Sequence, residues 1–154
     1  MIYQILKEEN QSIDTEQILR LYGSTCFSGT HQLISNQLTK SESEEMFGKC
    51  GNLHGHDFKL DVVVNQTDQD NPEQLESLLK SVKTELDGKH YNQLNMFKDN
   101  VCTCENMLHY IWQFIQDHTK ISIQSLTLTE TFNNRFKLFN FLLVVAKPVA
   151  FLTL

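Results

Sequence analysis

Three histidines are placed where their imidazole rings could hold one metal ion. His54 and His56 flank Gly55 at the start of an alternating apolar run, so both side chains project from one face of a strand, about 7 Å apart along it. A catalytic zinc usually takes three protein ligands and keeps a fourth position open for water or substrate. The best third ligand is His31, because residues 24–33 read as a first strand that could pair with this one. The alternative is three strand histidines with solvent or backbone partners, but the spacing favours a zinc site.

Other metal-binding side chains have weaker claims. His109 and His118 fall within or at the end of an amphipathic helix pattern, and we interpret both as structural or surface residues. Cys102 and Cys104 lack the two-residue gap that is typical of zinc ribbons. The acidic N-terminus has too short an apolar stretch for a secretory signal, which predicts a cytoplasmic protein with free thiols.

Composition limits the classes of protein that the chain can belong to. Its 154 residues, 40% of them hydrophobic, suit a single domain over 1–154, and no apolar run is long enough to span a membrane. Nineteen acidic residues against thirteen basic ones argue against a nucleic-acid partner, because phosphate binding needs clustered Lys and Arg.

Two helices are predicted from apolar spacing and caps. The first covers about 72–87, with Asn71 as the N-cap, Pro72 at the first helical position and Gln74 placed for a capping box. The second covers about 104–118 and is capped by Thr103. Their expected buried stripes are Leu75, Leu78, Leu79, Val82 and Leu86 in the first, and Met107, Leu108, Ile111, Trp112 and Ile115 in the second.

The strands complete an α+β pattern. Residues 121–131 alternate Leu126, Leu128 and Glu130 with hydroxyl side chains, which indicates a third strand, and the tail could add a fourth. We therefore expect an antiparallel four-stranded sheet with two helices on one face. The polar segment 35–49 is expected to be a surface loop that leads to Cys50.

Five separated motifs together resemble one family. They occur in the order and spacing of the 6-pyruvoyltetrahydropterin synthase and 6-carboxytetrahydropterin synthase family, and the resemblance covers roughly residues 20–135. The motifs are Phe27-Ser28-Gly29-Thr30-His31, Phe47-Gly48-Lys49-Cys50, His54-Gly55-His56, Cys104-Glu105-Asn106 with Tyr110-Ile111-Trp112, and Thr129-Glu130-Thr131.

This resemblance implies an assembly and a substrate. The family has a tunnelling fold, in which three subunits join their sheets into a barrel and two trimers stack into a homohexamer with active sites between subunits. The substrate is 7,8-dihydroneopterin triphosphate. The pyruvoyl branch eliminates triphosphate and rearranges the side chain, whereas the carboxy branch, on the route to queuosine, loses both triphosphate and acetaldehyde.

The resemblance also implies roles for single residues. Zinc on His31, His54 and His56 would bind the substrate's side-chain hydroxyls, and Cys50 matches the family's proton-shuttling cysteine. The alternatives for Cys50 are a fourth metal ligand or an inert thiol.

A second group of residues matches the positions that hold the pterin ring. Glu130 matches the anchor whose carboxylate accepts two ring N–H groups, unless a break in the strand's alternation turns it outward. Thr103, Cys104 and Glu105 match a second pterin-contacting segment, although Thr103 could equally be an ordinary helix cap.

Two departures from the family pattern concern catalysis and the C-terminus. The family has an adjacent Asp-His pair after the first helix, whereas here Gly88 follows Asp87 and His90 comes two positions late. Either a two-residue insertion brings His90 to Asp87, or the base is missing, in which case the chain would be a zinc- and pterin-binding protein with impaired turnover. The apolar extension 136–154 is expected to continue the sheet or to lie at a subunit interface.

The two branches are distinguished by spacing around the cysteine. Three residues separate Cys50 from His54, as in the carboxy branch, whereas the long 35–49 segment resembles the pyruvoyl branch. Since the first gap sets where the thiol lies relative to the metal, we expect a 6-carboxytetrahydropterin synthase, with the pyruvoyl enzyme as the alternative.

Overall fold

The fold is a twisted sheet with helices on one face. The computed structural model describes residues 20–65, 72–139 and 142–145 of the chain. Within them six strands form one sheet in the order β3-β1-β2-β4-β5-β6. The strands are β1 (Arg20–His31), β2 (His54–Asn65), β3 (Lys89–His90), β4 (Ile123–Thr131), β5 (Asn134–Phe139) and β6 (Leu142–Val145).

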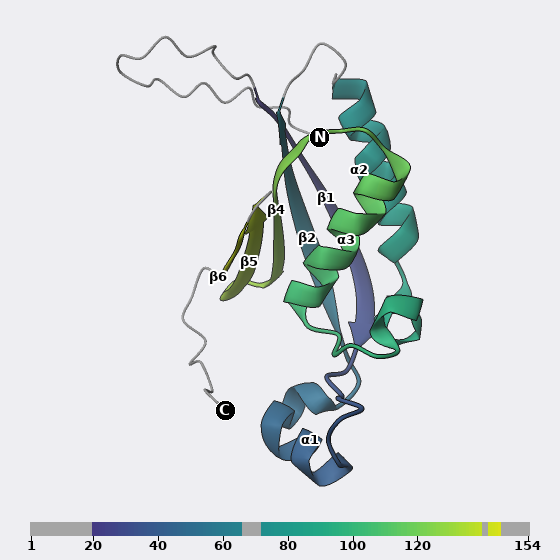
Figure 1. Cartoon of the computed structure of the whole chain (residues 1–154), viewed down its shortest axis with the longest axis vertical. Helices are drawn as coiled ribbons and strands as arrows, with labels where there is room; N and C mark the ends of the chain where they lie inside the picture. The colour runs from purple at the N-terminus through teal and green to yellow at the C-terminus, as the bar shows by residue number, and fades with distance from the viewer. Residues whose placement is uncertain (1–19, 66–71, 140–141, 146–154) are drawn as a thin grey trace, which may run out of the picture.

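Two long helices cover the sheet. Helices α2 (Pro72–Leu86) and α3 (Cys104–His118) lie on the same face of the strands (Figure 1). Each has an apolar stripe at helical spacing, which it buries against the sheet. The buried helical residues are Leu75, Leu78, Leu79, Val82 and Leu86 in α2, and Cys104, Met107, Leu108, Ile111 and Ile115 in α3.

The predicted α+β class with an antiparallel sheet and helices on one face is confirmed. Both long helices lie within a residue of their predicted bounds, and the Thr103 side chain caps α3 by accepting a hydrogen bond from the Asn106 backbone N–H. The predicted cap Asn71 lies outside the described residues. Trp112 is only partly buried, because it lies at the margin of the α3 stripe.

The sheet is larger than the four strands expected. The two-residue β3 runs parallel to β1, and β6 pairs with β5 in antiparallel register. The prediction that the tail continues the sheet is therefore confirmed for 142–145, and the rest of the tail beyond Phe139 lies outside the described residues. The short β3 could not be read from the sequence, because two residues carry no alternation pattern.

The prediction that 35–49 is a surface loop is wrong in part. It contains helix α1 (Lys40–Phe47), which lies at one end of the molecule, beyond the ends of β1 and β2 (Figure 1). A capping box explains the helix: Glu42 N–H donates to the Thr39 side chain, and the Glu42 carboxylate accepts from the Thr39 backbone N–H. A 3₁₀ turn, Gly48–Gly51, then leads to β2.

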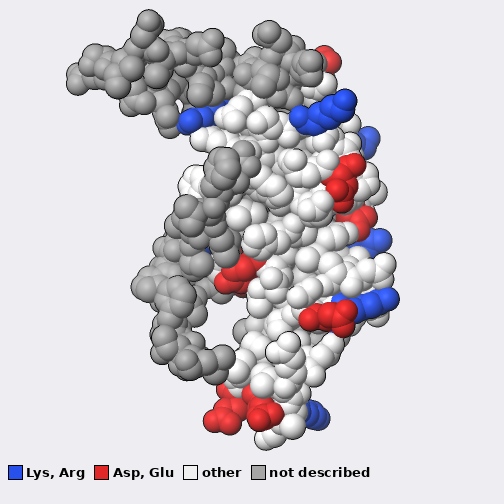
Figure 2. All heavy atoms as spheres, in the orientation of Figure 1, with Lys and Arg blue, Asp and Glu red and all other residues white. Residues whose placement is uncertain are grey.

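Surface charge on the described residues is mixed. On the face drawn in Figure 2, Lys and Arg side chains lie among Asp and Glu along one margin, and this view contains no continuous basic patch. Among the described residues, no helix is long and apolar enough to cross a membrane.

Candidate metal centre

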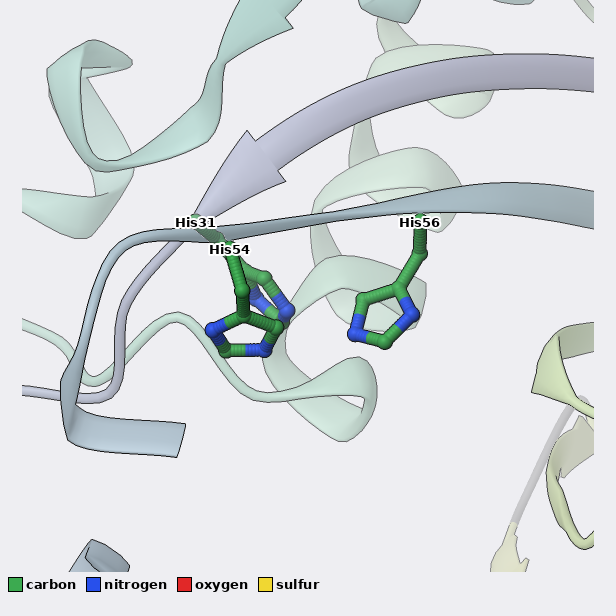
Figure 3. A group of neighbouring side chains, drawn as sticks. All are labelled: His31, His54 and His56. Atoms are coloured by element: carbon green, nitrogen blue, oxygen red, sulfur yellow. The ribbon is translucent and has the colours of Figure 1, made fainter. Parts of the chain in front are cut away.

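Strand pairing brings the three predicted histidines together. Strands β1 and β2 are antiparallel, and their register places His31 directly opposite His54. His56 lies two residues further along β2 and projects from the same side (Figure 3). One ligand atom from each histidine lies within 4.8 Å of the other two. Three imidazoles in this arrangement could hold a metal ion.

Backbone carbonyls determine which ring nitrogen carries the proton in two of the histidines. The Nδ1 atom of His31 lies 2.9 Å from the Cys102 carbonyl oxygen, and Nδ1 of His54 lies 2.7 Å from the Asn52 carbonyl oxygen. A carbonyl only accepts, so each Nδ1 must carry the proton and each Nε2 keeps a free lone pair. Such outer hydrogen bonds are typical of histidines that bind metals.

The free Nε2 atom of His31 is the strongest sign of a ligand. His31 is only 2% exposed, and its Nε2 is buried without a hydrogen-bond partner. A buried polar atom without a partner is costly, and a metal ion at this position would remove that cost. The residues present therefore fit a bound metal ion.

His56 has the electrostatic character of a neutral ligand. Burial is the largest influence and lowers the pKa of His56, and the neighbouring His31 and His54 act in the same direction. The Glu130 carboxylate opposes them without reversing the shift. A neutral imidazole is the form that binds a metal.

Glu130 points into the same site. Its Oε1 atom lies 3.4 Å from Nε2 of His31 and 3.4 Å from Nε2 of His56, and its side chain is 12% exposed. The β4–β5 register shifts between Thr129 and Thr131, which leaves Glu130 as the extra residue of a β-bulge. The sequence analysis allowed that a break in the strand's alternation would turn Glu130 outward. The break is present, but the Glu130 side chain points inward.

Hydrogen bonds keep the Glu130 carboxylate ionised. Burial acts to raise its pKa, but the neighbouring His31 and His56 rings and the hydrogen bond from Asn134 outweigh burial and hold the pKa at about 2. The Cys104 thiol also hydrogen-bonds this carboxylate, and burial followed by Glu130 raises the pKa of Cys104 far above its ordinary value. Cys104 is therefore a neutral donor beside Glu130.

Cys50 lies near the site without joining the histidine group. Its thiol is exposed on the 3₁₀ turn before β2, and its backbone carbonyl accepts a hydrogen bond from the Leu33 N–H at 2.8 Å. The cluster of possible ligands contains three histidines and no Cys50 among the described residues. The thiol is therefore accessible and lies outside the group of possible metal ligands.

Asp87 and His90 do not pair with each other. The Asp87 carboxylate accepts a hydrogen bond from the Ser28 backbone N–H at 2.8 Å and lies 3.1 Å from Lys83 Nζ. His90 pairs with Thr30 through β3, and its Nε2 atom is buried without a hydrogen-bond partner. The two-residue insertion therefore does not bring the imidazole to the carboxylate in this chain.

Gly88, which directly follows Asp87, has a backbone conformation that suits glycine. Its φ is +71°, a backbone conformation that glycine adopts easily and other residues rarely adopt. The Gly88 N–H donates to the Ser28 carbonyl at 2.7 Å, which joins the end of α2 to β1. A hollow of about 410 Å³ opens here, with His56, Gly88 and Lys89 among its lining residues.

The predicted pterin-contacting segment lies at the start of α3. Thr103 acts as the helix cap, because its hydroxyl accepts a hydrogen bond from the Asn106 N–H. Cys104 is buried against Glu130, whereas Glu105 is partly exposed in the first turn. The structure therefore brings Cys104 to Glu130 and assigns a capping role to Thr103.

Asn92 is a site residue that the sequence analysis missed. Its side chain accepts from the Gln32 N–H at 2.9 Å and donates to the Gln32 carbonyl at 2.8 Å, so it acts like a paired strand immediately after His31. No sequence motif marks this role. The carbonyls of Asn52 and Cys102 were equally unpredictable, because every residue carries a carbonyl group.

Comparisons with known proteins identify the family of this chain. Residues 20–140 match the family model described as "6-pyruvoyl tetrahydropterin synthase". The 6-pyruvoyl tetrahydrobiopterin synthase of Dictyostelium discoideum is 32% identical over 116 residues, covering 70% of this chain and 86% of that protein. The Homo sapiens enzyme of the same name is 32% identical over 119 residues, with 70% and 82% coverage. The solved 6-pyruvoyl tetrahydropterin synthase of Caenorhabditis elegans superposes with a TM-score of 0.74 at 26% identity, covering 79% of this chain and 95% of that one.

Proposed function

Because the chain belongs to the 6-pyruvoyl tetrahydropterin synthase family, we propose that it is a zinc-dependent lyase that eliminates triphosphate from 7,8-dihydroneopterin triphosphate. The observation that carries the proposal is the convergence of His31, His54 and His56, two of which have Nε2 freed by backbone carbonyls. A histidine triad with an open fourth position is the arrangement of a catalytic zinc.

Each proposed residue has a distinct task. The three histidines would hold zinc, which supplies Lewis acidity to the side-chain hydroxyls of the substrate. Cys50 would move a proton from a side-chain carbon, since its thiol is exposed on the 3₁₀ turn that leads into the strand of His54 and His56. Glu130 would accept the pterin ring's amide N–H and exocyclic amine, which a carboxylate can bind as a pair.

Two different observations favour two product outcomes. The names of the curated relatives favour 6-pyruvoyltetrahydropterin, formed by triphosphate elimination and rearrangement. The three-residue gap between Cys50 and His54 favours 6-carboxytetrahydropterin, formed with additional loss of acetaldehyde. We take the pyruvoyl product as the first candidate, because the relatives match along most of their length, and the carboxy product as the second.

Product analysis separates these outcomes. Purified zinc-loaded protein is incubated with 7,8-dihydroneopterin triphosphate, and triphosphate and acetaldehyde are both quantified. Triphosphate without acetaldehyde supports the pyruvoyl reaction, and equal amounts of both support the carboxy reaction. Release of neither contradicts a lyase function.

A third candidate is a zinc- and pterin-binding protein with impaired turnover. It is favoured by the engagement of Asp87 with Ser28 and Lys83, which leaves His90 without a carboxylate partner. Such a protein would bind zinc and a simple pterin with ordinary affinity yet release no triphosphate.

The proposal extends to assembly and location. We propose a homohexamer, a dimer of trimers, acting in the cytoplasm without nucleic-acid or membrane partners. The family relationship supports the assembly, and free cysteines, two of them exposed, fit a reducing compartment. Light scattering of the purified chain measures the assembly directly, and a monomer would contradict it.

A further inference from the structure

We propose that Asn134 is a positioning residue, which holds the Glu130 carboxylate in the orientation that receives the pterin ring. The inference rests on the proposed function, in which Glu130 accepts two N–H groups of that ring. It assigns a role to a residue at the turn between β4 and β5 that does not itself have to touch the substrate.

The turn between β4 and β5 brings Asn134 to Glu130. Strand β4 ends at Thr131, strand β5 begins at Asn134, and these two residues pair directly across the turn. The register shift just before this pair leaves Glu130 in the bulge. From the neighbouring strand, Asn134 Nδ2 donates a hydrogen bond to Glu130 Oε2 at 3.2 Å.

The two oxygens of Glu130 have different surroundings. Oε1 lies 3.4 Å from Nε2 of His31 and 3.4 Å from Nε2 of His56, whereas Oε2 accepts from Asn134. The Cys102 carbonyl keeps the His31 proton on Nδ1, so Nε2 of His31 has no hydrogen to donate to Oε1. Asn134 therefore supplies the carboxylate with a hydrogen bond that this histidine does not supply.

The carboxylate is held from two elements of the fold. The Cys104 thiol, buried at the start of α3, also hydrogen-bonds Glu130. The torsion that turns a glutamate carboxylate is soft, and donors on β5 and α3 together restrict it. A group that is already oriented loses less conformational freedom when a ligand binds, which favours affinity.

The hydrogen bond from Asn134 leaves both oxygens able to accept from the ring. An ionised carboxylate has about four lone-pair sites, and Asn134 uses one of those on Oε2. The amide N–H and the exocyclic amine of the ring can still bind the two oxygens as a pair. Because the Asn134 amide is neutral, it orients the carboxylate without cancelling the negative charge that strengthens this pair.

Binding of unsubstituted pterin to the zinc-loaded protein, followed by the fluorescence of the ring, tests the inference without turnover. The unmodified chain is compared with Asn134→Ala, Asn134→Asp and the control Asn133→Ala, which removes an identical side chain from the same exposed turn. Circular dichroism checks that each variant is folded. We expect Asn134→Ala to bind pterin about fivefold more weakly, the order of one net hydrogen bond, and Asn133→Ala to be unchanged. Zinc affinity should be normal in every variant.

Asn134→Asp separates positioning from formation of the turn. Asp has nearly the shape of Asn and is also favoured in turns, so a role in the turn alone predicts normal pterin binding. The new carboxylate has no N–H to donate and repels Glu130, so positioning predicts a loss at least as large as in Asn134→Ala. Normal pterin binding in either Asn134 variant overturns the inference. An equal loss in Asn133→Ala, or weakened zinc binding in Asn134→Ala, also overturns it.

Triphosphate release by the unmodified protein is measured separately. Release together with normal pterin binding in both Asn134 variants overturns the positioning role alone. Pterin binding that depends on Asn134, without any release of triphosphate, overturns the proposed lyase activity alone.

Discussion

Asn92 bonds both backbone groups of Gln32, accepting from its N–H at 2.9 Å and donating to its carbonyl at 2.8 Å. Gln32 directly follows His31, so this amide side chain holds the end of β1 where a neighbouring strand would otherwise be needed. The position of His31, the most buried histidine of the triad, therefore depends on Asn92, which lies sixty positions beyond Gln32 along the chain.

Replacing Asn92 should loosen the metal site. Asn92→Ala removes both hydrogen bonds to Gln32, and we expect zinc affinity to fall about tenfold, as is common for residues that orient a ligand. The free energy of unfolding should fall by about 1–3 kcal/mol, because partly buried backbone groups lose their partners. Chelator competition and urea unfolding measure the two effects. Asn133→Ala, in the exposed β4–β5 turn, is the control; an equal loss of zinc affinity there would contradict the interpretation.

Cys50 should be needed for turnover and not for zinc binding. In Cys50→Ala we expect triphosphate release to slow on the order of a hundredfold or more, the usual contribution of a positioned acid or base, with zinc content unchanged. Cys26→Ala, which removes the other exposed thiol, should behave like the unmodified chain. Loss of zinc from Cys50→Ala would show that the thiol is a ligand after all.

The variant His90→Ala tests whether His90 acts as a base in turnover. If its buried, unpartnered Nε2 meets the substrate, His90→Ala should slow triphosphate release while zinc affinity stays normal. The exposed His109 offers a matched control, since His109→Ala removes an imidazole on the outer side of α3. Normal turnover in His90→Ala would mean that Cys50 or water carries the proton alone.

A polar cluster on the sheet links stability to pH. Burial acts to raise the pKa of Asp61, but hydrogen bonds from Lys59 and Tyr22 outweigh it and hold the pKa below its ordinary value. A depressed carboxyl pKa stabilises the fold above the unfolded value of about 3.9, and this contribution is lost as the pH falls through the folded value.

The variant Asp61→Asn tests this cluster. It should lower the free energy of unfolding by about 1 kcal/mol at pH 7, and the difference from the unmodified chain should shrink as the pH falls below 4. Urea unfolding at several pH values measures it. A difference that stays constant with pH would contradict a role for the ionised carboxylate.

Much of the fold follows from local patterns in the sequence. The stripes of α2 and α3 have helical spacing, and Thr103 is a strong cap, so both helices could be placed closely. Helix α1 was missed because its apolar content is low, although Thr39 and Glu42 form a capping box that the sequence contains.

The site could be predicted only where the type of side chain and the alternation of side chains along a strand are enough to place a residue. His54 and His56 share a face by alternation, and His31 joins them because β1 pairs with β2. The position of Glu130 beside His31 and His56 depends on a bulge, and the separation of Asp87 from His90 depends on Ser28 and Lys83. Such tertiary contacts leave no periodic signal in the chain.

The most direct test of the account is triphosphate release from 7,8-dihydroneopterin triphosphate as zinc is added back to metal-free protein. The histidine triad predicts that release appears with zinc and reaches its maximum near one equivalent per chain. His54→Ala should neither hold zinc nor release triphosphate. Equal release by the metal-free protein, or by His54→Ala, would contradict the central claim that these three histidines form the catalytic metal centre.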